Sequence, residues 1–314
     1  YLWKNEQRIA LRNEVVPAGR KADNRYFEPG YATKRLDYSH DLIHSEALSF
    51  IKRNRHHPFF LYLALTIPHA NNEGARGTGD GQEVPDYGIY SDKAWSNQDK
   101  GQAAMITRMD QGIGEMVALL DELGIGDNTI IMFTSDNGHH DEGGHNPETF
   151  DPNGPLRGKK RDLYEGGIRV PMIVRWPGKI KPGSITDHVS YFGDLMSTVG
   201  QLTGASVPTG LDSISFLPTL LGKPGQRNHE YLYWEFYEQG GKQAVRSANW
   251  KAVRIPMFNG EIELYNLGDD LGESKNVASN HPEIVERLQQ FMTLAHQPNP
   301  NWKARGKAPS KRPE

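Results

Sequence analysis

The stretch Thr129 to Gly138 has the sequence Thr-Ile-Ile-Met-Phe-Thr-Ser-Asp-Asn-Gly. Its first six residues are apolar or β-branched, which predicts a buried strand over 129–134. Asp136 and Asn137 follow, and their carboxylate and amide oxygens are hard ligands of the kind that Ca²⁺ or Mg²⁺ prefers. Gly138 permits a sharp turn of the backbone. Asp-Asn-Gly is also typical of an ordinary turn, so the motif alone leaves both interpretations open.

The composition limits the class of protein. The chain has 314 residues, a formal net charge of −3 at pH 7 and no cysteine. This length predicts one large domain, or one large and one small. The near-neutral charge gives no electrostatic case for nucleic acid or an anionic membrane as partner. The lack of cysteine excludes disulfides and a cysteine nucleophile in the sequence given, and no apolar run approaches the length of a membrane span.

The residues around this stretch predict an α/β fold with a mainly parallel sheet flanked by helices. A helix is expected over 37–54, with Ser39 or Asp41 as its cap. The apolar run Phe59 to Thr66 is typical of a strand buried on both faces. A polar loop over 71–97, a helix around 105–123 and the strand at 129–134 follow. The order strand, loop, helix, strand indicates a βαβ crossover.

The C-terminal part of the chain has a different pattern. A further strand over 170–176 and short helices over 191–202 and 213–221 complete the larger domain, expected at 1–225. A small α+β domain is expected at 226–296, and a polar tail at 297–314. The small domain would contain an antiparallel sheet with strands at 231–236, 243–247, 250–254 and 262–267. Its helix, 282–296, would pack on that sheet through Ile284, Val285, Leu288, Phe291, Met292 and Leu294.

Polar side chains follow two of the predicted strands. His69 comes after the run 59–66, and Asp136 and Asn137 come after the strand 129–134. Because ligands bind outside the carboxyl ends of parallel strands, we expect these side chains at one rim of the sheet. A lone histidine after a proline is also compatible with a structural or solvated role.

A glycine-rich basic run precedes the strand at 170–176. The run, Gly154 to Pro171, carries Lys159, Lys160 and Arg161, which suit an anionic group such as sulfate or phosphate. A solvated basic loop is the alternative interpretation. Combined with a pair of hard-cation ligands and a histidine, the run favours metal-assisted hydrolysis of an anionic ester.

Four segments resemble the arylsulfatase-type sulfatases of the alkaline phosphatase superfamily, in the order found in that family. They are Pro-Phe-Phe-Leu-Tyr-Leu-Ala-Leu-Thr-Ile-Pro-His (58–69), Phe-Thr-Ser-Asp-Asn-Gly (133–138), Gly-Gly-His (143–145) and Leu-Arg-Gly-Lys-Lys-Arg-Asp-Leu-Tyr-Glu-Gly-Gly-Ile-Arg-Val-Pro (156–171). Residues 231–236 and 263–267 resemble the small C-terminal domain of the family. The resemblance runs to about His296 and implies that 1–225 is the C-terminal part of the catalytic domain.

The resemblance implies a role for individual residues. Asp136 and Asn137 would be two ligands of the catalytic divalent cation, Ca²⁺ or Mg²⁺. Lys160 would contact the sulfate and the bridging oxygen beside His69, and either could protonate the leaving group. Possible substrate contacts are His140 and His145. The resemblance also implies a sulfated carbohydrate or aryl ester as substrate, and a periplasmic or extracellular location.

Several family motifs do not occur in this sequence. Sulfatases of this type open with paired aspartates and a Cys/Ser-x-Pro-x-Arg segment, whose first residue becomes formylglycine, followed by a Gly-Lys-x-His-type segment. The serine motif Ser206-Val207-Pro208-Thr209-Gly210 lacks the arginine. Tyr1 is neither an initiator methionine nor the start of a signal peptide. We therefore expect formylglycine and the remaining metal ligands in a segment upstream of Tyr1.

Two other functions remain open at this stage. One is a phosphoester or phosphonate hydrolase of the same superfamily, which a bare Thr or Ser nucleophile with two metals would indicate. The other is a non-catalytic protein that binds an anion or a glycan through the cationic loop. Nothing in the sequence indicates the sulfated substrate, the position of its sulfate or the oligomeric state.

The isolated chain 1–314 should show no sulfatase turnover and only weak metal binding, because the expected nucleophile and half of the metal ligands are absent from it. The test is an assay of the purified chain with an aryl sulfate, with and without Ca²⁺. Measurable Ca²⁺-dependent hydrolysis would contradict the expectation.

Overall fold

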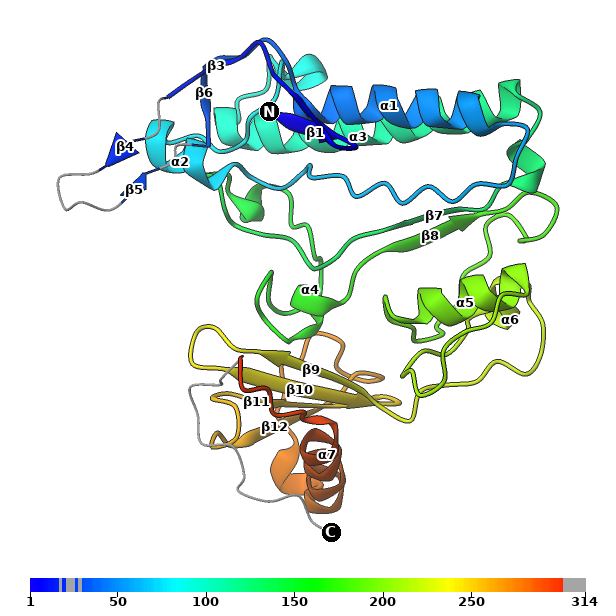
Figure 1. Ribbon diagram of the computed structural model, residues 1–314. Coiled ribbons are helices and arrows are strands. Elements are labelled where there is room, and N and C mark those ends of the chain that lie inside the picture. Colours follow the sequence, from blue (N-terminus) through cyan, green and yellow to red (C-terminus); the bar gives the residue numbers. More distant parts are fainter. Residues whose placement is uncertain (17–18, 21–25, 28–29, 302–314) are drawn as a thin grey trace. The chain divides into compact units, whose positions relative to one another are not determined.

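The computed structural model describes residues 1–16, 19–20, 26–27 and 30–301 (Figure 1). They form two compact units. Unit 1 comprises Tyr1–Thr129 and His140–Pro152, and unit 2 comprises Ile130–His139 and the chain from Asn153 onward. The predicted tail lies outside the described residues after residue 301. No helix in the described ranges combines the length and the apolar character needed to cross a membrane.

Unit 1 is built on two packed helices, α1 (Ser39–Asn54) and α3 (Asn97–Glu122), and both confirm predicted helices. Ala47 and Ile51 of α1 and Met105 and Leu120 of α3 are buried. The predicted cap of α1 was wrong, since its N-terminus has no side-chain cap. Asp41 instead accepts hydrogen bonds from Arg108 of α3, at 2.7 Å from Nε and 2.6 Å from Nη2. The carboxylate thus joins the two helices instead of ending one.

Short elements complete unit 1. The segment predicted as a polar loop contains α2 (Asn72–Thr78), whose cap Asn71 accepts from the amides of Glu73 and Gly74. Three antiparallel pairs precede α1, and they are β1 (Leu2–Lys4) with β2 (Gln7–Ile9), β3 (Glu14–Val15) with β6 (Ala32–Lys34), and β4 (Gly19–Arg20) with β5 (Tyr26–Phe27). Single 3-10 turns are η1 (Gly88–Tyr90), η2 (Gly126–Asn128) and η3 (Pro147–Thr149).

The run Phe59 to Thr66 does not form the predicted strand in the structure. Its side chains alternate between covered and exposed positions, as in extended backbone, and the exposed set includes Phe60 at 67% and Tyr62 at 65%. The prediction of a strand buried on both faces was therefore wrong. An apolar pattern records which side chains would gain from burial, but a strand also needs a neighbouring backbone to pair with. No described strand pairs with this run.

Unit 2 contains two of the predicted strands, β7 (Ile131–Thr134) and β8 (Met172–Arg175). They pair with each other antiparallel, with Ile131 opposite Arg175. Every strand pair among the described residues is antiparallel, so the structure does not contain the predicted parallel sheet. The connection from β7 to β8 contains no helix long enough for a parallel crossover, since α4 (Glu165–Ile168) has one turn.

The four-stranded antiparallel sheet predicted near the C-terminus is confirmed. Its order is β12-β11-β10-β9, formed by β12 (Ile262–Asn266), β11 (Trp250–Arg254), β10 (Lys242–Ser247) and β9 (Leu232–Phe236). The predicted hairpin is also present, because Ser247 pairs with Trp250. Two predicted helices upstream are present as α5 (Asp194–Thr203) and the shorter α6 (Leu217–Leu220). A 3-10 turn, η4 (Ala278–Asn280), precedes the last helix.

The last helix, α7 (Pro282–Ala295), packs on the sheet as predicted. Leu288 and Met292 are fully buried with Val245, Ala252 and Leu264 of the sheet. Leu294 was assigned wrongly to the packed face, since 54% of it is exposed. An amphipathic pattern locates the centre of the packed face better than its edges.

Replacing Leu288 by alanine should lower the free energy of unfolding of unit 2 by about 2–5 kcal/mol, because the change removes buried methyl groups and leaves a cavity. Leu294→Ala, on the exposed edge of the same helix, is the matched control and should cost far less. Urea unfolding followed by circular dichroism measures both. Equal losses in the two variants would contradict the packing described here.

A buried histidine near the start of α1 should make the stability of unit 1 depend on pH. His40 is 4% exposed, and neither ring nitrogen has a hydrogen-bond partner among the described residues. Burial lowers the pKa of His40, and the nearby charge of Asp41 only partly opposes this. Below a pH of about 6.5 the unfolded chain takes up a proton that folded His40 resists. The free energy of unfolding should therefore fall as the pH drops below that value.

His40→Gln should flatten this fall, and His56→Gln, at an exposed position after α1, should not. The measurement is urea unfolding of each variant at pH 8 and pH 5. The same pH dependence in His40→Gln and in the unmodified chain would show that His40 is not its source.

Candidate functional site

The turn after β7 carries the two predicted metal ligands, Asp136 and Asn137. Asp136 is exposed and Asn137 is half-buried. The Asn137 side-chain nitrogen donates to the Gly138 carbonyl at 2.9 Å, and the Ser135 hydroxyl donates to the Asn137 carbonyl at 3.1 Å. Because the amide nitrogen is occupied by its own turn, the amide oxygen is the atom that can face a cation.

Gly138 is required by a close backbone approach. Its N–H donates to the Gly167 carbonyl at 2.9 Å. A Cβ at Gly138 would lie 1.8 Å from the Gly166 carbonyl oxygen. From the sequence we expected Gly138 to permit a sharp turn of the backbone. Its φ is not positive, so an unusual backbone conformation is not what requires a glycine here. The glycine is needed because a side chain would occupy the space of α4.

The basic loop is held against the same turn. The Lys160 N–H donates to the His139 carbonyl at 2.7 Å, and the Gly166 N–H donates to the Arg157 carbonyl at 2.7 Å. Arg161 has a left-handed backbone, with φ 78°. The structure thus places the loop that carries Lys160 against the turn that carries Asp136 and Asn137, all in unit 2.

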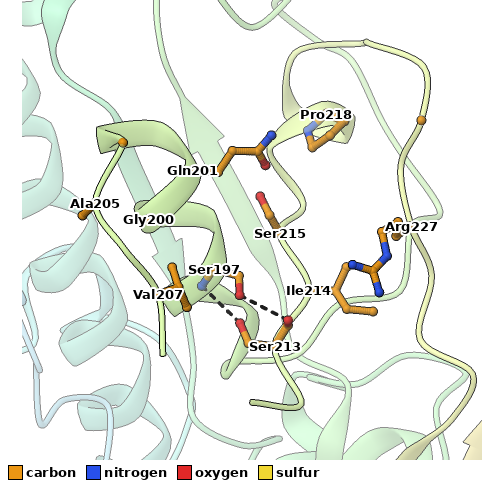
Figure 2. Close-up of a pocket in the computed structure, with 12 residues that line it drawn as sticks. Ser197, Gly200, Gln201, Ala205, Val207, Ser213, Ile214, Ser215, Pro218 and Arg227 are labelled. Atoms are coloured by element: carbon orange, nitrogen blue, oxygen red, sulfur yellow. Dashed lines mark hydrogen bonds between the residues drawn. The ribbon is translucent and has the colours of Figure 1, made fainter. Parts of the chain in front are cut away.

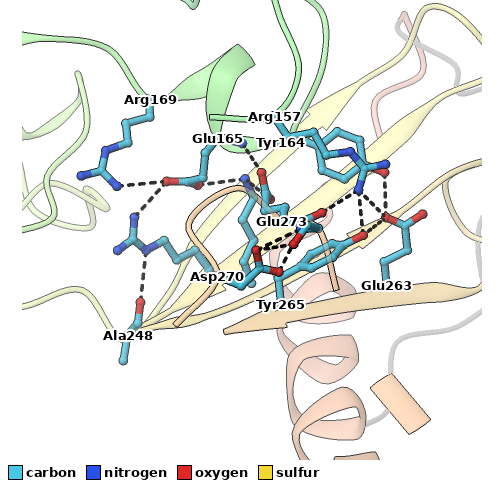
Figure 3. Close-up of polar contacts among 12 residues, drawn as sticks. Arg157, Tyr164, Glu165, Arg169, Ala248, Glu263, Tyr265, Asp270 and Glu273 are labelled. Atoms are coloured by element: carbon cyan, nitrogen blue, oxygen red, sulfur yellow. Dashed lines mark hydrogen bonds and ion pairs between the residues drawn. The ribbon is translucent and has the colours of Figure 1, made fainter. Parts of the chain in front are cut away.

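Sequence reasoning missed the charged residues behind this loop, which Figure 3 shows. Lys251 Nζ lies 2.8 Å from Glu165 Oε1 and 3.0 Å from Glu273 Oε1. The Arg157 guanidinium stacks 3.8 Å from the centre of the Tyr164 ring and donates to the Glu273 carbonyl at 2.9 Å. These residues lie far apart in the sequence, and the only local indication was the pair Gly166-Gly167.

The other predicted site residues form a histidine cluster in unit 1. The ring centres of His69 and His140 are 5.6 Å apart, and those of His140 and His145 are 5.0 Å apart. His140 Nδ1 accepts from the Glu142 N–H and Nε2 donates to the Pro68 carbonyl, each at 3.1 Å. Burial lowers the pKa of His140, although the bond to Pro68 opposes the shift. His140 is therefore a neutral ring whose two nitrogens both have backbone partners.

His69 and His145 differ in exposure. The His69 side chain is 44% exposed, its Nδ1 donates to the Ala70 carbonyl at 2.7 Å, and its Nε2 lies 3.7 Å from Glu142 Oε2. His145 is buried, and its Nδ1 lies 3.1 Å from Gln82 Nε2. Gln82 also donates to the Glu142 carbonyl at 2.8 Å. Gln82 and Glu142 were not predicted from the sequence, and they position the histidines.

The described residues supply only part of the donor set that the predicted metal site needs. No group of three or more acidic, histidine or cysteine side chains in the described ranges could hold a metal ion. Asp136 and Asn137 nevertheless supply one carboxylate and one amide oxygen on a fixed turn. This donor set fits part of the oxygen shell of Ca²⁺ or Mg²⁺.

A hollow of about 480 Å³ lies beside α5 and contains none of the predicted site residues (Figure 2). Its wall is fixed by Ser197, whose N–H donates to the Ser213 hydroxyl and whose hydroxyl donates to the Ser213 carbonyl, each at 3.1 Å. Arg227 is an exposed cation in its lining. Among the described residues, the lining contains no aspartate, glutamate, histidine or lysine side chain. This part of the lining therefore lacks the general acid or base that the histidine cluster and the Lys160 loop could supply.

Family models match most of the chain. A sulfatase model matches residues 13–205, and a model described as N-sulphoglucosamine sulphohydrolase, C-terminal, matches residues 158–297. The first of these alone spans more than half of the sequence.

Individual relatives agree with the family models. An N-acetylgalactosamine-6-O-sulfatase of Bacteroides thetaiotaomicron is 31% identical over 282 residues, which are 80% of this chain and 50% of the relative. The human N-acetylgalactosamine-6-sulfatase is 35% identical over 80% of this chain and 44% of the relative. A solved structure of Ps i-CgsB with k-i-k-neocarrahexaose has 28% identity and a TM-score of 0.69, over 83% of this chain and 55% of that chain.

The chain spans about half the length of these relatives. Within that span, the model matches cover the Asp136 turn, the histidine cluster and the Lys160 loop. This chain therefore belongs to the sulfatase family.

Proposed function

We propose that this protein is a sulfuric ester hydrolase that removes sulfate from a sulfated carbohydrate with the help of a divalent cation. One observation carries the proposal. In a chain of the sulfatase family, the oxygen ligands of Asp136 and Asn137 lie on a turn that is hydrogen-bonded to the loop of Lys160. A cation held by this turn and the ammonium group of the adjoining loop would suit an ester that carries negative charge. No described contact favours the phosphoester hydrolase or the binding protein.

Asp136 and Asn137 would hold the cation, either Ca²⁺ or Mg²⁺. The exposed Asp136 carboxylate gives a negatively charged ligand, and Asn137 adds a neutral oxygen from the next position. A bound cation would supply positive charge to a sulfate oxygen. Ca²⁺ takes about six to eight oxygen ligands, so other groups and water would complete the shell. Formylglycine, which the resemblance implies as the nucleophile, stays a prediction.

Lys160 and His69 would assist the departure of the leaving group. The Lys160 ammonium would stabilise the negative charge that develops on the bridging oxygen as the S–O bond breaks. In His69 the Nδ1 proton is directed at the Ala70 carbonyl, so Nε2 is the nitrogen that would exchange a proton with the substrate. His140 and His145 would border the substrate. Because both nitrogens of His140 have backbone partners, we expect its ring to form part of the wall of the substrate site and not to exchange a proton with the substrate.

The substrate class is proposed from the relatives. Two of them are named after N-acetylgalactosamine, and Ps i-CgsB was solved with k-i-k-neocarrahexaose. We therefore propose a sulfated carbohydrate as the natural substrate and an aryl sulfate as a convenient probe. A substrate of this kind is consistent with the implied periplasmic or extracellular location, which stays a proposal.

Two predictions about the architecture also remain proposals. The division into 1–225, 226–296 and 297–314 places the four-stranded sheet and α7 in the small domain. The other is a mainly parallel sheet flanked by helices, which the extended run 59–66 would join only by pairing with another strand. Its support is the alternating exposure of the extended backbone, which leaves apolar side chains such as Phe60 and Tyr62 uncovered.

Lys160→Ala should lower kcat for an aryl sulfate by about 10²–10³, because it removes a charge that acts on the leaving oxygen. Lys181→Ala removes the same charge from an exposed position in unit 2 and is the matched control. The assay should use the full product of the gene. Equal activity of the two variants would remove Lys160 from the mechanism, and a wild-type protein that cleaves aryl phosphate but not aryl sulfate would overturn the proposed function.

Asp136→Ala should raise the Ca²⁺ concentration needed for half-maximal activity, because it removes the charged ligand of the pair. Asp212→Ala, at an exposed position of unit 2, controls for the change in net charge. The measurement is a Ca²⁺ titration of aryl sulfate turnover after treatment with a chelator. Identical titration curves for the wild type and Asp136→Ala would exclude Asp136 as a ligand.

A further inference from the structure

A network of buried charges joins α4 to the C-terminal sheet (Figure 3). Lys251 of β11 is fully buried, and its Nζ lies between Glu165 Oε1 and Glu273 Oε1, at 2.8 Å and 3.0 Å. The Glu165 N–H donates to Glu273 Oε2 at 2.6 Å. All three side chains are removed from solvent, and none is a predicted contact of the cation or the sulfate.

The charges of this network depend on one another. Glu165 Oε2 has two further cations nearby, with Arg246 Nη1 at 3.5 Å and Arg169 Nη1 at 3.6 Å. Glu273 forms an ion pair with Lys251, and burial raises the pKa of Glu273 while Lys251 opposes the shift. Removing one partner of a buried pair leaves an uncompensated charge, which is strongly unfavourable. The network therefore favours a single arrangement of Glu165 and Glu273.

Glu273 reaches this arrangement through an unfavourable backbone conformation. Its φ is 51°, in the left-handed region that a non-glycine residue seldom adopts. The loop around it is fixed, since the Asp270 carboxylate accepts from the amides of Ser274 and Lys275 at 2.9 Å and 2.8 Å. The Glu273 carbonyl accepts from Arg157. Backbone strain of this kind persists only where surrounding contacts hold it.

A short path of hydrogen bonds leads from this network to the candidate site. Glu165 begins α4 and is followed by Gly166 and Gly167. The Gly166 N–H bonds to Arg157 in the basic loop, and the Gly167 carbonyl accepts from Gly138 in the turn of Asp136. A Cβ at Gly138, Gly166 or Gly167 would lie within 2.4 Å of a backbone oxygen. The turn, the basic loop and α4 can therefore pack closely only where these three glycines meet the neighbouring backbone. A shift of α4 would displace both the turn and the loop.

We propose that Lys251 is a positioning residue for the cation-binding turn and for Lys160. It acts through Glu165 and Glu273, whose charges it compensates, and so fixes α4 against the turn of Asp136. The purpose of this arrangement rests on the proposed function. The fixing of α4 by Lys251 does not depend on that function, because it concerns hydrogen bonds that exist without substrate.

The test compares hydrogen exchange in the full chain and in Lys251→Met, which keeps the length of the side chain and removes its charge. Exchange in peptides covering 136–139 and 158–168 should become faster by at least about 100-fold in the variant. Lys251→Met combined with Glu273→Gln removes the carboxylate that depends on the lysine, and should restore slow exchange. Leu288→Ala, which loosens the opposite face of the sheet, should not accelerate these peptides selectively.

Unchanged exchange at 136–139 and 158–168 in Lys251→Met would overturn the inference. So would fast exchange in the double variant, whether or not the single variant folds, because charge compensation would then not be what positions the loops. Turnover of an aryl sulfate by the unmodified full product of the gene decides the proposed function separately. A protein with no such activity but with the expected exchange pattern would retain the positioning role and lose its proposed purpose.

Discussion

The close backbone contact between Gly138 and the Gly166-Gly167 turn is the constraint on which the candidate site in unit 2 depends. It is made by a single hydrogen bond, from the Gly138 N–H to the Gly167 carbonyl, and by the absence of side chains at the point of contact. The contact holds the turn that carries Asp136 and Asn137 against α4. The loop that carries Lys160 joins the same place through the His139 carbonyl.

This arrangement separates the groups that would meet the substrate from the groups that hold them. Asp136 is exposed, whereas the supporting charges of Lys251, Glu165 and Glu273 are fully buried. The histidine cluster of unit 1 has a similar division. His69 is partly exposed, and Gln82 is buried behind the cluster and bonds to the Glu142 carbonyl. In both units, buried polar groups support the segments that carry the exposed ones.

The sequence predicted local structure and chemistry better than long-range arrangement. The helices α1, α3 and α7 and the four-stranded sheet follow from periodicity and turn residues, which depend on near neighbours. Asp136, Asn137 and Lys160 were predicted as site residues from residue type and from family resemblance, and they stay predictions. Lys251 and Glu273 were missed because a buried lysine is recognisable only by its partners, and Glu165 lies 86 positions from Lys251. The run 59–66 was predicted as a paired strand because its pattern reports apolar side chains and not a neighbouring backbone.

The central claim is that the Asp136 turn and the Lys160 loop form one cation site. Its most direct test is the effect of Mn²⁺ on backbone amide signals in the nuclear magnetic resonance spectrum of the ¹⁵N-labelled chain. Mn²⁺ prefers the same oxygen ligands as Ca²⁺ and Mg²⁺, and it broadens signals of nearby nuclei even when it binds weakly. We expect the amide signals of 136–139 and 158–162 to broaden first and together, and added Ca²⁺ to reverse the effect. Broadening that begins elsewhere, or that affects the Asp136 turn without the Lys160 loop, would contradict the claim.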